Sequence, residues 1–111
     1  MENTEETANR ARKFIFDKSK EFGTAKANRT YIEHFLKSKV ALLMSESEET
    51  TMAGKEMYAK KHDEYIALLY GLKEAVAIEE ELKWKLISAQ LAVEIYRTES
   101  ANNRAIDRGM A

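Results

Sequence analysis

The stretch LKEAVAIEEELKWKLISAQLAVEIYR, residues 72–97, decides the fold of this chain. It contains no Gly or Pro and is rich in Leu, Ala, Glu and Lys, which favour helices. On a helical wheel it carries two apolar stripes that lie roughly opposite each other. The first consists of Ile78, Leu82, Leu86, Ala89, Val93 and Tyr96, and the second of Trp84, Ile87, Leu91 and Ile95. Because a surface helix of a monomer needs only one such stripe, we expect this helix to be covered on both sides.

The composition indicates a single small all-α domain that spans residues 1–111. The chain has no Pro and only four Gly, whereas strand-rich folds need frequent turn residues. A hydrophobic content of 44% with 33% charged residues is typical of a globular protein. No apolar run approaches the roughly 20 residues of a membrane span. The opening MENTEETANR lacks the pattern of a signal peptide, so we expect a cytoplasmic protein without a membrane association.

Apolar spacing divides the chain into four expected helices. The first covers residues 5–22 and ends at Gly23, and the second covers residues 24–45. A short helix runs from Thr50 or Thr51 to about Lys61.

The last expected helix is the longest, from about residue 64 to residue 100, with Asp63 as its N-cap. Its apolar repeat is near 3.5 residues, the coiled-coil period. We expect it to pack antiparallel against the second helix, in a helical hairpin or a bundle of three to four helices. Residues 1–22 form either a packed helix or a mobile arm, and the tail 101–111 frays or docks elsewhere.

The second apolar stripe, Trp84, Ile87, Leu91 and Ile95, is the candidate interface. It either holds the first helix or meets its symmetry mate in a two-fold dimer. We favour the homodimer.

Catalytic and metal-binding patterns are absent from the sequence. There is no Cys, and neither His34 nor His62 has a Glu three residues before it, as helical di-iron sites require. The run from Glu79 to Glu81 fans out around a helix, and no Glu-x-x-Asp motif accompanies it. The four glycines are scattered singly, so no phosphate-binding loop can form. We therefore expect a protein that is not an enzyme and that has no metal or cofactor.

A basic segment, residues 10–39, carries nine Lys or Arg against three acids. Such a segment can bind nucleic acid through its phosphates. The candidate contacts are Arg10, Arg12, Lys13, Lys18, Lys20, Lys26 and Arg29. The alternative is a solvated helix surface, or neutralisation by packing against the acidic residues 46–81.

Three segments resemble a group of small, uncharacterised helical phage proteins encoded among phage recombination and replication genes. They are YIEHFLKSKVALLM (31–44), EYIALLYGLKEAV (64–76) and ELKWKLISAQLAVEIYRTESANNRAIDRG (81–109). The matching residues are Lys37, Lys39, Trp84, Arg97, Glu99, Asn103 and Arg104. Asp63 and Tyr70 depart from the pattern, where a proline and an acid are usual. The resemblance implies a phage context and no catalytic residue.

These observations lead to three functional hypotheses. The first is a non-enzymatic phage protein that acts in the host bacterial cytoplasm through contacts with itself or with another phage or host protein. It is expected to be accessory to phage DNA recombination or replication. The second is a nucleic-acid-binding accessory protein that uses the basic segment. The third is a phage inhibitor of a host defence system.

Overall fold

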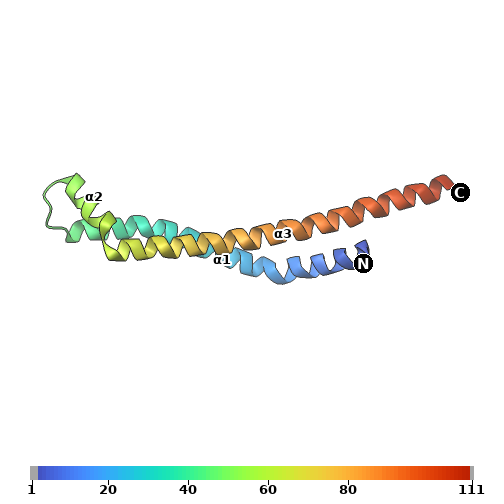
Figure 1. Cartoon of the computed structure of the whole chain (residues 1–111), viewed down its shortest axis with the longest axis horizontal. Coiled ribbons are helices and arrows are strands. Elements are labelled where there is room, and N and C mark those ends of the chain that lie inside the picture. Colours follow the sequence, from blue (N-terminus) through green and yellow to red (C-terminus); the bar gives the residue numbers. More distant parts are fainter. Residues whose placement is uncertain (1–2, 111) are drawn as a thin grey trace. The chain divides into compact units, whose positions relative to one another are not determined.

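A computed structural model describes residues 3–110 and contains three helices within them (Figure 1). Helix α1 covers Thr4–Glu46, α2 covers Met52–Lys61 and α3 covers Asp63–Met110. No strand occurs among these residues. The all-α class and the long C-terminal helix predicted from the sequence are therefore confirmed.

The contacts of the chain fall into two compact units. Unit 1 contains α1 up to Phe22 and α3 from Glu81 onward, and unit 2 contains residues 23–80. The description of the chain as one domain stays a prediction.

In unit 2, α1 and α3 run antiparallel and meet along a seam of buried and half-buried side chains. The seam positions alternate in steps of three and four residues, which is the coiled-coil spacing. They are Ala25, Arg29, Ile32, Leu36, Lys39 and Leu43 on α1, and Tyr65, Leu68, Leu72, Ala75 and Glu79 on α3. Leu43 is completely buried, as is Ala59 of α2. Apolar burial along this seam is the main force that holds the two helices together.

Two ion pairs join the helices of unit 2. Arg29 Nε lies 2.6 Å from Glu79 Oε2, and a second guanidinium nitrogen lies 3.0 Å from Glu79 Oε1. This two-pronged contact with Glu79, together with Glu33, raises the pKa of Arg29 above its usual value. Near the other end of the unit, Lys39 Nζ lies 2.7 Å from Glu64 Oε2 and lowers the pKa of that carboxyl. Charged partners at seam positions favour a single register, because sliding either helix would separate them.

Unit 1 has a seam of the same spacing but of different composition. Its α1 positions are Ala8, Ala11, Ile15, Lys18 and Phe22, and its α3 positions are Leu82, Leu86, Ala89, Val93, Tyr96 and Ser100. Ala8 and Ala11 are buried, and such small side chains let two helix backbones approach closely. Thr4 donates a 2.6 Å hydrogen bond to Glu99, and the Arg12 guanidinium lies 5.6 Å from the centre of the Tyr96 ring. These contacts show that the helices are antiparallel.

Gly23 does not end a helix, contrary to the sequence-based prediction. It lies inside α1, and no described glycine has the positive φ that a C-terminal glycine stop requires. A glycine inside a helix costs about 1 kcal/mol relative to alanine. Phe22 is half-buried and Ala25 is buried on either side of it. Packing of such neighbours outweighs the low propensity of one glycine.

Two further helix ends differ from the predictions, and one agrees. Thr51 caps α2 as expected, since its hydroxyl accepts from the Gly54 N–H. At the start of α3, however, His62 is the cap: its Nδ1 accepts from the Glu64 N–H and its carbonyl from the Ile66 N–H. Helix α3 also continues past the predicted end near residue 100, through residues 101–110, with exposed side chains over 101–109; fraying of this tail stays a prediction.

Candidate interaction surface

The second apolar stripe lies on the solvent side of α3 in unit 1, and we call it the outer stripe: Trp84, Ile87, Leu91 and Ile95. Trp84 is 60% exposed, and Leu91 and Ile95 are each 53% exposed. Ile87 is half-buried. Three large apolar side chains within three helical turns therefore face solvent in the single chain.

The first stripe faces α1 and is covered by it. Leu82 is buried, and Leu86, Ala89, Val93 and Tyr96 are half-buried. Ile78 is the exception, because it is 54% exposed and its assignment to the covered stripe is wrong. Ile78 is the neighbour of the seam position Glu79. Its angle on a straight helical wheel groups it with the first stripe, whereas the three-and-four spacing of the seam selects Glu79 instead. The two faces of α3 in unit 1 thus have similar chemistry and opposite burial.

Charged side chains border the outer stripe. Lys83 Nζ lies 5.5 Å from the centre of the Trp84 ring, a cation–π contact at the edge of the stripe. Glu94 is exposed and lies within about 20° of Lys83 on the helical wheel. On the other flank, Lys85 and Glu81 form their own pair at 3.0 Å. The stripe therefore has an apolar centre and a charged rim, the usual anatomy of a protein contact surface.

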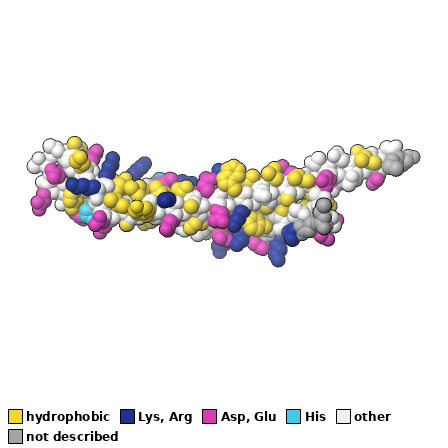
Figure 2. Space-filling view, in the orientation of Figure 1, with side chains coloured by type: hydrophobic (Ala, Val, Ile, Leu, Met, Phe, Trp, Pro, Cys, Tyr) yellow, Lys and Arg dark blue, Asp and Glu magenta, His cyan; other side chains and the backbone are white. Residues whose placement is uncertain are grey.

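The predicted nucleic-acid contacts are distributed over both units, and several of them contact other residues of the chain. Arg29 belongs to unit 2 and binds Glu79 and Glu33. Lys18 lies 3.0 Å from Glu21, and Arg12 contacts Asn9 and Tyr96. Arg10 lines a shallow hollow of unit 1. The exposed lysines of this set are Lys13, Lys20 and Lys26. Figure 2 shows Lys and Arg side chains projecting from the unit 1 part of α1.

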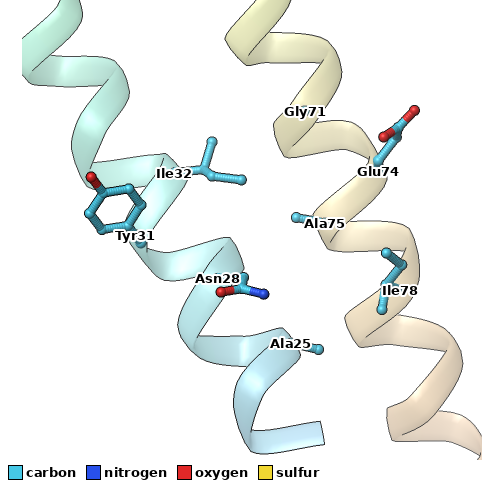
Figure 3. Close-up of a pocket in the computed structure, with 8 residues that line it drawn as sticks. All are labelled: Ala25, Asn28, Tyr31, Ile32, Gly71, Glu74, Ala75 and Ile78. Carbon is cyan, nitrogen blue, oxygen red and sulfur yellow. The ribbon is translucent and has the colours of Figure 1, made fainter. Parts of the chain in front are cut away.

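Unit 2 has a groove of about 340 Å³ between α1 and α3 (Figure 3). Small residues hollow it out: Ala25, Gly71 and Ala75. In Figure 3, Asn28 and Ile32 extend from α1 toward α3. The remaining lining residues are Tyr31, Glu74 and Ile78. Glu74 is the one carboxylate among these lining residues, and neither histidine lies there.

Among residues 3–110 no group of three or more His, Asp or Glu is placed to hold a metal ion. No helix in the described chain has the length and apolar character needed to cross a bilayer.

Sequence reasoning missed two features of unit 2. Glu79 was read as part of an acidic run and Arg29 as a phosphate contact, although both fall on the three-and-four spacing of the seam. That spacing was the signal for their pairing. The second feature is an exposed apolar patch on the unit 2 part of α3, where Figure 2 shows hydrophobic side chains. The patch comprises Ile66, Leu69, Tyr70 and Val76, which are 38–64% exposed.

Comparisons of the chain with protein-family models, curated proteins and solved structures found no match.

Proposed function

We propose that this protein works without catalysis, as a helical protein that binds another protein through the outer stripe. The observation that carries the proposal is the exposure of Trp84, Leu91 and Ile95, each more than half accessible on one face of α3. Large exposed apolar patches with polar rims mark sites of association. Tryptophan is among the residues that dominate binding energy at such sites.

The resemblance to small phage proteins supports a context for this binding. It favours an accessory role in phage DNA recombination or replication, in the host bacterial cytoplasm. A host defence protein as the target is an alternative of the same physical kind, since it would be held by the same stripe.

The proposal is tested by separating binding from folding. We expect Leu91→Asp to keep the helical circular-dichroism signal and thermal midpoint of the wild type, because the side chain lies outside the seam. The variant should lose the partners that co-purify with the tagged wild-type chain from phage-infected cells. Gln90→Asp is the matched control, since it adds the same charge at an exposed neighbour on another face. Unfolding of Leu91→Asp, or equal capture by both variants, contradicts the proposal.

Nucleic-acid binding is the second candidate, and the exposed Lys13 and Lys20 favour it. These residues are seven apart, so they lie on one face of α1. Binding through them should weaken steeply with salt. Reversing both charges should reduce binding to a single- or double-stranded oligonucleotide, whereas reversing Lys60 and Lys61 of α2 should not. An absence of binding at low salt rules this candidate out.

A further inference from the structure

We infer that the partner of the outer stripe is a second copy of the chain, docked antiparallel across a two-fold axis at the level of Ala89. The inference rests on the proposed function and names the partner of that surface. In a two-fold contact the same surface serves both copies, so it must complement itself. The outer stripe meets this condition in its apolar positions and in its rim charges.

The apolar positions complement each other in the antiparallel direction. When Ile87 lies opposite Leu91 of the second copy, Leu91 lies opposite Ile87 in return. Residue 84 then falls opposite residue 94, so the Trp84 ring enters the gap between Leu91 and Ile95 of the second copy. This is knobs-into-holes packing, in which a side chain fits between residues of the facing helix.

The rim charges select the antiparallel direction. Lys83 and Glu94 lie on the same flank of the stripe, and a two-fold axis of this kind brings equal flanks together. Lys83 of each copy then faces Glu94 of the other, which makes two ion pairs. A parallel two-fold dimer would instead bring opposite flanks together, so Lys83 would lie beside the Glu81–Lys85 flank of the second copy and would not meet Glu94.

The size of the stripe sets the expected strength. A large apolar side chain that is half exposed contributes roughly 100 Å². The three exposed side chains of each copy, with a smaller share from the half-buried Ile87, bury roughly 700 Å² in total. This is less than the 1,200–2,000 Å² of standard stable interfaces. The dimer is therefore weak and forms at micromolar concentrations or above.

Cysteine cross-linking tests the geometry, because the wild-type chain contains no Cys. Near the axis, Ser88→Cys should couple to itself through a short bis-maleimide. Thr98→Cys should not, since the two copies of residue 98 lie about 27 Å apart along the helices. A mixture of Thr98→Cys with Glu80→Cys should couple, because those positions face each other.

Charge reversal tests the pairing independently. Lys83→Glu alone and Glu94→Lys alone should each dimerise less than the wild type, because like charges then face each other. Mixing the two variants should restore dimers made of one chain of each kind. Failure of the mixture to recover overturns the assigned pairing.

Two outcomes of the cross-linking overturn the inference. If Thr98→Cys couples to itself as well as Ser88→Cys does, the copies are parallel. If no variant couples at high concentration, the partner is not a second copy. In that case a folded Leu91→Asp chain that loses its co-purifying partners leaves the proposed function standing, whereas an unfolded one removes both.

Discussion

The two faces of α3 in unit 1 carry nearly the same apolar side chains but have different surroundings. Leu82 on the inner face is 8% exposed, and Leu91 on the outer face is 53% exposed. Both belong to one uninterrupted helix, so helix propensity does not separate them. The difference shows that a second apolar stripe exceeds what the described chain can bury by itself.

The largest expected effect is the difference in stability between truncating a leucine on the inner face and truncating a leucine on the outer face. Leu82→Ala should lower the free energy of unfolding by about 2–3 kcal/mol, because it removes buried methyl groups and leaves a cavity. Leu91→Ala should change it by less than about 0.5 kcal/mol, as exposed positions usually do. Urea unfolding at low protein concentration, where the weak dimer is dissociated, measures both. Equal losses would mean that the faces do not differ.

The ion pair between Arg29 of α1 and Glu79 of α3, in the seam of unit 2, provides the next test. Arg29→Ala should lower the thermal midpoint by several degrees, since it removes the guanidinium from a Glu79 side chain that is only 13% exposed. Replacing Arg29 and Glu79 together by Ala should restore part of the loss. The control is Lys26→Ala, which removes an exposed charge from the same helix and should have little effect. An Arg29→Ala chain as stable as the control would contradict a structural role for the pair.

A smaller effect, of opposite sign, is expected on the solvent side of α1. Gly23 is exposed, and an added Cβ would meet no atom within 4 Å. Gly23→Ala should therefore raise the free energy of unfolding by about 0.5–1 kcal/mol, because alanine loses less backbone freedom. Chemical denaturation measures the change. Destabilisation would mean that α1 is interrupted at this residue.

The smallest effect concerns pH. Lys39 lowers the pKa of Glu64 in the folded chain, so the ionised form is favoured by folding. This contribution is present above the ordinary glutamate value of 4.5 and is lost as the pH falls through the lowered folded value. In Lys39→Met the thermal midpoint should fall less steeply over that acidic range than in the wild type. Identical pH profiles would show that the pair contributes nothing.

The sequence predicted the helical class, the extent of α2 and the two faces of α3, because hydrophobic spacing reports them directly. It misplaced the end of the first helix at Gly23, because local propensity does not register the packing of Phe22 and Ala25. His62 was missed as the cap of α3 because Asp63 is the better N-cap by residue type.

The same limit of sequence-based prediction applies to the candidate interface residues and to the candidate nucleic-acid contacts. Periodicity identified the outer stripe as apolar but left open whether the first helix covers it, and its exposure follows only from the structure. Arg29 was misjudged as a surface cation, because its pairing with Glu79 depends on contacts fifty residues apart in the chain. Residues far apart in sequence come together only through the register of the two helices.

Fluorescence of Trp84, the only tryptophan in the chain, tests most directly whether the outer stripe joins two copies. Burial of its ring in a dimer predicts that the emission maximum moves to shorter wavelength as the protein concentration rises through the micromolar range. Leu91→Asp, which keeps the tryptophan, should show no such shift. An emission maximum that stays at the long wavelength of an exposed indole at every concentration would contradict self-association through this surface.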